Sequence, residues 1–124
     1  MAKVKKLDDT QLLVDVIIKG LQDVKGEDIV SIDMRKLDNA VTAYFVICTG
    51  TSNTHVAALG SSVEREVRNT LKDRAWHTEG YRNAEWVLLD YINVVVHIFQ
   101  KEQRDFYNLE GLWADAEITQ VKQA

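Results

Sequence analysis

Apolar residues recur at helical spacing in two long segments of the chain. Near the start, Leu13, Ile17 and Leu21 lie four residues apart, and this spacing predicts a helix over residues 10–24 that a glycine then ends. A second helix is predicted to begin after the loop Gly50–Thr54, which is rich in side chains that cap helices. Its buried stripe consists of residues three or four apart: Val56, Leu59, Val63, Val67 and Leu71.

Other segments have the pattern of strands. Residues 28–34 alternate between apolar and polar side chains, whereas residues 43–49 form a continuous apolar run that stops at a glycine. Such a run is typical of a central strand covered on both faces, and Cys48 within it is expected to be a buried, unreactive thiol. Strand, helix and strand in succession predict a parallel crossover. Residues 76–78 are compatible with a further short strand. The sequence leaves open whether Trp76 and His77 lie in the core or at a loop tip.

Two apolar runs, Trp86–Asp90 and Val94–Phe99, flank a short break and predict a β-hairpin. A two-residue loop, Ile92-Asn93, would pair Trp86 with Phe99, Leu88 with His97 and Asp90 with Val95. Residues paired across two strands lie on the same face of the sheet. One face then consists of apolar residues and is expected to face the core: Val87, Leu89, Tyr91, Val94, Val96 and Ile98. The other face mixes large apolar and ionisable groups, which suits a surface that meets another molecule.

A second register of this hairpin stays open. A two-residue loop favours a positive φ, which the β-branched Ile92 resists. A three-residue loop with Asn93 in the left-handed conformation would instead move His97 to the face opposite Asp90. We prefer the two-residue loop because it divides the two faces more cleanly.

The segment after the hairpin predicts one aromatic helix through residues 106–113. Phe106, Leu109 and Trp113 share a helical stripe and are expected to pack inward, whereas Tyr107 points elsewhere. Residues 1–7 and 114–124 are polar and are predicted to be frayed tails. The whole pattern predicts one α/β domain over residues 1–124, in which a mixed sheet of four or five strands packs against helices.

Composition narrows the class of partner. The 124 residues are 46% hydrophobic and 27% charged, as in an ordinary soluble protein, and no apolar run is long enough to cross a membrane. A single cysteine excludes an internal disulfide and fits a reducing compartment. The net charge of −4, without a basic and aromatic stripe, predicts little direct contact with nucleic acid and favours a basic protein as partner.

Candidate chemistry is sparse. The loop Gly50–Thr54 between a strand and a helix has the position of an anion-binding loop, but it lacks the spacing of known phosphate motifs and favours a simple turn and cap. The three histidines lie in separate elements without zinc-ligand spacing, so no metal is expected. In the preferred register Asp90 and His97 would form a pair, with Ser52 as a conceivable nucleophile. A structural or interface hydrogen bond is the favoured interpretation of that pair.

Three segments together carry a resemblance to a known family. They are Trp86-x-Leu-x-Asp90, then Val94-Val-Val-His97-x-Phe99, then Arg104-x-Phe-Tyr-x-Leu-Glu-x-Leu-Trp113, and the runs Asp28–Asp33 and Tyr44–Ser52 agree with them. Over roughly residues 10–113 the chain resembles the ribosomal silencing factor (Iojap) family. It departs from the family in the hairpin turn, where Ile92-Asn93 replaces the usual Gly-Asp, and at Ala43, where the family often has Asp.

The resemblance implies a non-enzymatic translation inhibitor in the bacterial cytoplasm, without cofactor or metal. It would bind the large ribosomal subunit through large-subunit protein fourteen and block joining of the small subunit by occupying space, damping translation when nutrients are scarce. It also implies a possible homodimer. The expected partner-binding residues are Trp86, Leu88, Asp90, His97, Tyr107 and Leu109. For Tyr107 and Leu109, as for the rest of the aromatic row, the alternative is a plain core residue.

The same resemblance raises an enzymatic alternative, since the family is similar in fold to nucleotidyltransferases. Those enzymes carry a Gly-Ser followed closely by two alternating carboxylates that bind metal ions. Here Asn53, Thr54, His55 and Val56 follow Ser52, and no carboxylate appears before Glu64. The alternative function is therefore a nucleotide-binding or small-ligand-binding protein, or a divergent nucleotidyltransferase, that uses the loop Gly50–Thr54.

Overall fold

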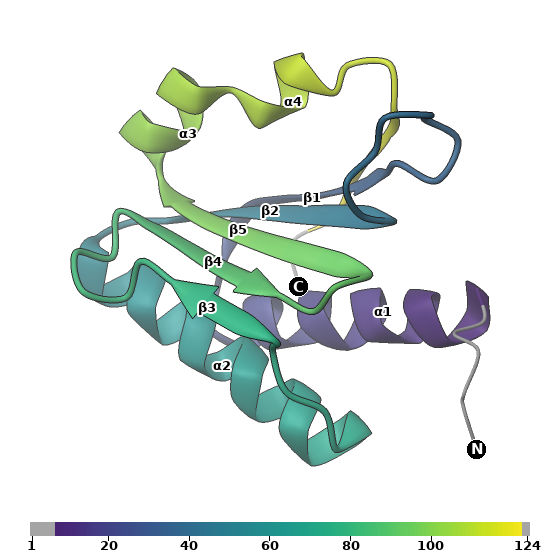
Figure 1. The fold of residues 1–124 in the computed structure, drawn as a ribbon. Coiled ribbons are helices and arrows are strands. Elements are labelled where there is room, and N and C mark those ends of the chain that lie inside the picture. Colours follow the sequence, from purple (N-terminus) through teal and green to yellow (C-terminus); the bar gives the residue numbers. More distant parts are fainter. Residues whose placement is uncertain (1–6, 123–124) are drawn as a thin grey trace.

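The computed structural model describes residues 7–122 and contains one six-stranded sheet with helices on both faces (Figure 1). The elements follow one another along the chain as α1 (Leu7–Asp23), β1 (Glu27–Asp33), β2 (Tyr44–Gly50), α2 (Asn53–Leu71), β3 (His77–Glu79), β4 (Trp86–Asp90), β5 (Val94–Gln100), α3 (Lys101–Tyr107), α4 (Leu109–Leu112) and β6 (Glu117–Gln120). The predicted α/β class is confirmed. The predicted strand number of four or five is too low by at least one, because β6 was not foreseen.

The sheet has the strand order β3-β4-β5-β2-β1-β6. Strands β2 and β5 run parallel, and every other neighbouring pair is antiparallel. All seven residues of β2 are buried, as predicted for a central strand. Burial also raises the pKa of the Cys48 thiol to about 12, so this cysteine is the unreactive core residue that the sequence indicates.

Helices α1 and α2 pack side by side against one face of the sheet (Figure 1). The predicted stripe of α2 is buried there through Val67, and it meets the hairpin face that was expected to be apolar. All six residues of that hairpin face are buried: Val87, Leu89, Tyr91, Val94, Val96 and Ile98. No helix within residues 7–122 is long and apolar enough to cross a membrane.

The prediction of frayed tails is wrong at the C-terminal end. Residues 117–120 form β6, which pairs antiparallel with β1, and the N–H of Val121 donates to the carbonyl oxygen of Ile29 at 2.9 Å. All four residues of β6 are exposed, so the strand is held by backbone hydrogen bonds and leaves no alternating apolar signal in the sequence. At the other end, Leu7 already belongs to α1, and residues 1–6 of the predicted tail lie outside the described residues.

Two residues have special roles in the turn between β3 and β4. The hydroxyl of Tyr81 donates to the carboxylate of Glu64 on α2. Gly80 has a φ of +93°, and a Cβ at this position would overlap the carbonyl oxygen of Trp86, so only glycine fits. Trp76 is 72% exposed, which resolves the open question about this residue in favour of the surface.

Candidate functional site

The hairpin of β4 and β5 has the two-residue register, so the three-residue alternative is wrong. Asp90 lies opposite Val95, and the other two predicted pairs are present as well. Ile92 adopts the φ of +75° that its branched side chain resists. Its N–H donates to Oδ1 of Asp90 at 2.8 Å, and its carbonyl oxygen accepts from the Thr42 hydroxyl at 2.8 Å. Both bonds hold the turn in this unfavourable conformation.

The predicted single helix over residues 106–113 is instead two short helices, α3 and α4. They meet at Asn108, whose backbone is left-handed and whose side-chain oxygen accepts the N–H of Gly111 at 3.2 Å. We call residues 101–112 the α3–α4 arch. The break destroys the expected helical stripe: Leu109 and Trp113 pack inward, but Phe106 is 80% exposed, contrary to the prediction. Asn suits this break because it tolerates the left-handed region better than other residues with side chains.

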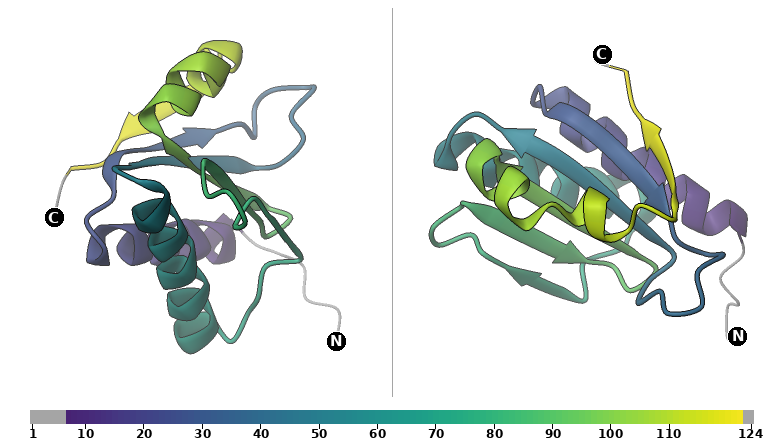
Figure 2. Two further views of the ribbon diagram at one scale, coloured as in Figure 1. Left: turned by 90° about the vertical axis from the view of Figure 1, so that its left-hand side faces the viewer. Right: turned by 90° about the horizontal axis from the view of Figure 1, so that it is seen from above.

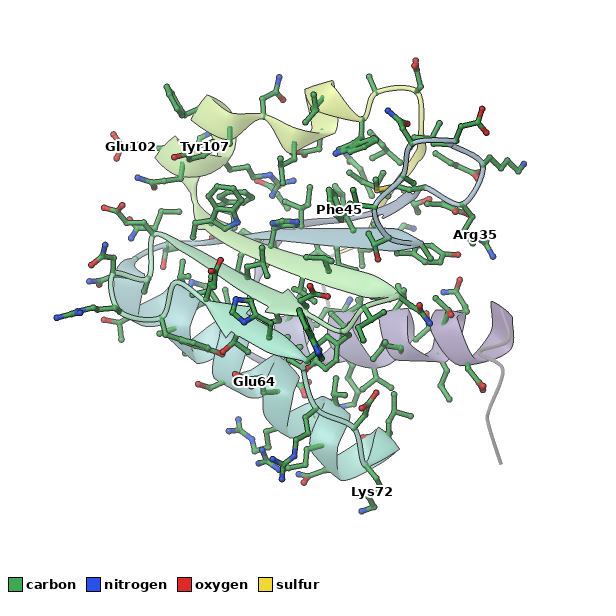
Figure 3. The ribbon with its side chains drawn as sticks, viewed as in Figure 1. Arg35, Phe45, Glu64, Lys72, Glu102 and Tyr107 are labelled. Carbon is green, nitrogen blue, oxygen red and sulfur yellow. The ribbon has the colours of Figure 1, made fainter. Side chains whose placement is uncertain are left out.

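The arch covers only part of its face of the sheet. Seen from above, it lies over β2 and β5 and leaves β3 and β4 uncovered (Figure 2). Tyr107 lies on the α3 part of the arch, and Phe45 points from β2 toward α4 (Figure 3). The second, smaller hydrophobic cluster of the protein fills the covered part; it contains Val30, Ile32, Met34, Phe45, Ile47 and Phe99.

An aromatic group lies where the covered and uncovered parts meet. The Trp86 ring lies 4.6 Å from the Tyr107 ring and 4.8 Å from the Phe99 ring, measured between centroids. Trp86 is half-buried and Tyr107 is 48% exposed, so both rings present area to solvent while their inner sides pack. We call Trp86, His97, Phe99 and Tyr107 the aromatic cluster.

His97 is buried within this cluster, at 5% exposure, so its placement on an accessible contact surface was wrong. The indole N–H of Trp86 donates to His97 Nδ1 at 3.1 Å, and the ring of Phe45 packs edge-on at 4.6 Å. Because Nδ1 accepts this bond, the neutral ring carries its proton on Nε2, a buried atom without a partner among the described residues. Burial lowers the pKa of His97 to about 4, which keeps the ring neutral and able to orient Trp86.

The suggested pair of Asp90 and His97 does not form. Asp90 uses its carboxylate for the turn at Ile92, and His97 bonds to Trp86. Of the six predicted contact residues, Trp86, Tyr107 and Leu109 come together at the arch. The other three are distributed along the hairpin: Leu88 is half-buried opposite His97, and Asp90 lies at the far end of β4, half-buried beside the turn.

Arg104 is a residue that the sequence pattern did not single out beyond its place in the family motif. Its side chain is buried beneath the arch and joins α3 to β1, β2 and α4 through hydrogen bonds. A buried arginine is rare unless it is paired, but no sequence signal distinguishes Arg104 from its equally charged and exposed neighbours Lys101 and Asp105.

The loop Gly50–Thr54 forms a turn and helix cap. The N–H of Thr51 donates to Nδ1 of His55, and the N–H of His55 donates to Oγ of Ser52, so donors that an anion would need are used within the loop. The adjoining hollow of about 340 Å³ carries Glu27, Asp28 and Glu102 against Lys101. Within residues 7–122, no three His, Cys, Asp or Glu side chains are grouped to hold a metal ion.

Comparison with known proteins identifies relatives over nearly the whole chain. A family model described as "Ribosomal silencing factor during starvation" matches residues 7–124. The ribosomal silencing factor of Halalkalibacterium halodurans is 34% identical over 90% of this chain and 94% of its own length. The ribosomal silencing factor of Bacillus subtilis is 35% identical over 88% of this chain and 91% of its own length.

Relatives also occur in plants and among solved structures. The chloroplastic Iojap protein of Zea mays is 34% identical over 81% of this chain and 42% of its own length. A crystal structure of a protein from Chromobacterium violaceum superposes with a TM-score of 0.80 at 34% identity, covering 93% of this chain and 95% of that chain.

Proposed function

Because the chain belongs to the family of ribosomal silencing factors, and so has a ribosome-associated silencing role, we propose a specific mechanism for it. It binds the large ribosomal subunit through large-subunit protein fourteen and represses translation by occupying the surface that the small subunit needs for joining. It acts without catalysis, in the bacterial cytoplasm where the ribosomes are. The homodimer that the family resemblance implies stays a prediction, which sedimentation of the purified protein tests.

The observation that carries this proposal is the partly covered face of the sheet. Trp86 and Tyr107 are held by packing on one side and present ring surface on the other. Half-exposed aromatic residues on a preformed face are typical anchors of protein interfaces, because they bury a large area with little loss of side-chain entropy. Leu88 extends this surface along β4, and Leu109 supports it from the arch.

Charge favours a basic protein as the partner. The chain has a net charge of −4, and the uncovered strands carry Glu79 opposite Leu88 and Asp90 opposite His77. An acidic surface repels the phosphate backbone of ribosomal RNA and attracts a basic ribosomal protein. We therefore assign to Asp90 two roles: its carboxylate holds the hairpin turn, and its charge faces the partner.

Substitution of Asp90 separates these two roles. Asp90→Asn keeps a side-chain oxygen that accepts the Ile92 N–H but removes the charge, so it should weaken binding to large subunits and reduce the salt dependence of what remains. Asp90→Lys should weaken binding further, because a like charge then faces the basic partner. If both variants bind like the wild type at low salt, Asp90 is outside the interface.

Co-sedimentation with purified ribosomal subunits tests the proposed function. We expect binding to isolated large subunits and not to isolated small subunits, and a reduced yield of joined ribosomes when the protein is added before the two are mixed. Binding should need no added nucleotide, and no Mg²⁺ beyond the concentration already present to keep the subunits intact. Equal co-sedimentation with both subunits, or with neither, would contradict the proposal.

A further inference from the structure

We propose that Arg104 is a positioning residue for the partner-binding face: it clamps the α3–α4 arch to the sheet and so holds Tyr107 against Trp86. This inference rests on the proposed function for its biological meaning, but the geometry is independent of it. The side chain is only 10% exposed although it comes from a short surface helix. Its hydrogen-bond partners lie on β1, β2 and α4, outside the aromatic cluster.

The guanidinium group of Arg104 bonds to three elements at once. Nη1 donates to the carbonyl oxygen of Asp28 at 2.6 Å and to the hydroxyl of Thr49 at 2.8 Å. Nη2 donates to the carboxylate of Glu110 at 2.7 Å. These partners lie near the start of β1, near the end of β2 and on α4. One side chain therefore connects both halves of the arch to the sheet.

The pair of Arg104 and Glu110 depends on the break in the arch. In a continuous helix with about 3.6 residues per turn, residues six apart point roughly 120° away from each other and lie more than a turn and a half apart along the axis, so they cannot pair. The left-handed backbone of Asn108 turns α4 so that Glu110 reaches Arg104. Tyr107 immediately precedes this break, so the ion pair and the position of the Tyr107 ring depend on the same bend.

Strand β1 is shaped to meet the clamp. Its register against β2 shifts between Glu27 and Val30, and Asp28 within this bulge has a φ of +48°. Bulges commonly redirect groups out of the ladder of a sheet, and here the carbonyl oxygen of Asp28 accepts from Arg104. An unfavourable backbone conformation is therefore retained at the point where the arch is attached.

The chemistry of the site requires arginine and makes a free anion site a poor alternative. Nη1 donates to a carbonyl and a hydroxyl while the Nε and Nη2 edge donates to a carboxylate, and the single ammonium of lysine cannot reproduce this planar array of donors. The carboxylate of Glu110 already compensates the charge of Arg104 within the protein. The site is therefore suited to holding the arch on the sheet and not to binding an anion.

The test compares Arg104→Met with Lys101→Met, which removes a cation from the same helix at an exposed ion pair with Asp105. The first readout is the NMR resonance of the Trp86 indole N–H, assigned with Trp86→Phe, which senses the nearby Tyr107 ring. The second is the affinity for purified large-subunit protein fourteen. Both are measured at a temperature at which each variant is fully folded.

We expect Arg104→Met to move the Trp86 resonance toward its position in Tyr107→Ala and to lower affinity by about tenfold or more. Lys101→Met should change neither, and the indole of the distant Trp76 should stay in place in every variant. If Arg104→Met does not fold, Glu110→Gln, which keeps shape but removes the carboxylate charge, should give the same changes in weaker form.

Unchanged Trp86 resonance and unchanged affinity in a folded Arg104 variant would overturn the inference. So would a general shift of all indole resonances in both Arg104→Met and Glu110→Gln, because that result indicates a loss of fold and not a change in the position of Tyr107. If the wild type itself does not bind protein fourteen, the proposed function fails, while the resonance of Trp86 still decides whether Arg104 positions Tyr107.

Discussion

The two faces of the sheet are covered in different ways. On one face, two long helices, α1 and α2, cover a cluster made mainly of aliphatic side chains, most of which are almost fully buried. On the other face, the short α3–α4 arch covers a smaller cluster in which aromatic rings are prominent, and β3 and β4 are left uncovered (Figure 2). We call the first the closed face, because its side chains are packed as in a core. We call the second the open face, because aromatic rings at the margin of its cluster still reach solvent.

This difference separates stability from recognition. Burial of aliphatic side chains contributes most of the free energy of folding and needs no partner. The aromatic cluster is held in place by the rest of the molecule, through the hydrogen bond from Trp86 to His97 and the attachment of the arch by Arg104. A preorganised surface of this kind loses little entropy on binding, which favours a tight complex.

The largest effect on stability is expected from the closed face. Leu59 on α2 is fully buried, and Leu59→Ala should lower the free energy of unfolding by about 2–5 kcal/mol because it leaves a cavity. Denaturant titration measures this change. Leu112→Ala on the arch, where the side chain is 71% exposed, should stay within about 0.5 kcal/mol. Equal losses in the two variants would remove the distinction between the faces.

Trp86→Ala should show the opposite balance. We expect a loss of about 2–4 kcal/mol in binding to large subunits, as for an interface anchor, and a smaller loss of stability than in Leu59→Ala because the ring is only half-buried. Melting temperature and affinity, measured on the same preparation, separate the two. Leu12→Ala is the control, because this half-exposed side chain lies on α1, which covers the other face of the sheet (Figure 1). A large melting drop with unchanged affinity would place Trp86 in the core alone.

Acid should weaken the aromatic cluster through His97. Burial lowers the pKa of this histidine from 6.5 to about 4 in the folded protein. The unfolded chain therefore binds a proton first, and stability is lost as the pH falls from about 6.5 to about 4, by up to about 3 kcal/mol. His97→Asn, which keeps an oxygen to accept the Trp86 N–H, should lack this part of the pH dependence. Parallel stability curves for the two proteins from pH 7 to pH 4 would refute the prediction.

The smallest expected effect is a gain in stability at the hairpin turn. Ile92 has a φ of +75°, which costs a β-branched residue about 1–2 kcal/mol, whereas glycine adopts it freely. Ile92→Gly should therefore raise the free energy of unfolding by about 1 kcal/mol after the entropy of glycine is allowed for. Val41→Gly, at an exposed loop residue without a positive φ, should not stabilise. A loss of stability in Ile92→Gly would show that the side chain itself contributes at the turn.

Much of the closed face was predictable from the sequence because its residues follow regular periods. The period of two in the hairpin identified its register and its buried side chains, and the apolar run of β2 identified the central strand. The stripe of α2 was equally regular. In each of these elements the local pattern and the packing in the folded protein agree.

The open face, which the arch covers only in part, was less predictable. Its structure depends on single residues and on contacts between residues distant in the sequence. One left-handed residue, Asn108, turned a predicted helix into an arch and placed Phe106 outside. The bonds of Arg104 join residues up to 76 positions apart, which no local pattern reports. The strand β6 forms with exposed side chains only, and His97 is buried among the rings of Phe45, Trp86 and Phe99 on its own and neighbouring strands.

The affinity of Tyr107→Ala and Leu12→Ala for purified large-subunit protein fourteen tests the central claim most directly. The two side chains are matched in exposure, at 48% and 49%, but Tyr107 belongs to the arch on the open face and Leu12 to α1 on the closed one. We expect Tyr107→Ala to lose about tenfold or more in affinity, while Leu12→Ala binds like the wild type. Wild-type affinity in Tyr107→Ala, together with a loss in Leu12→Ala, would place the partner on the other side of the molecule and contradict the account.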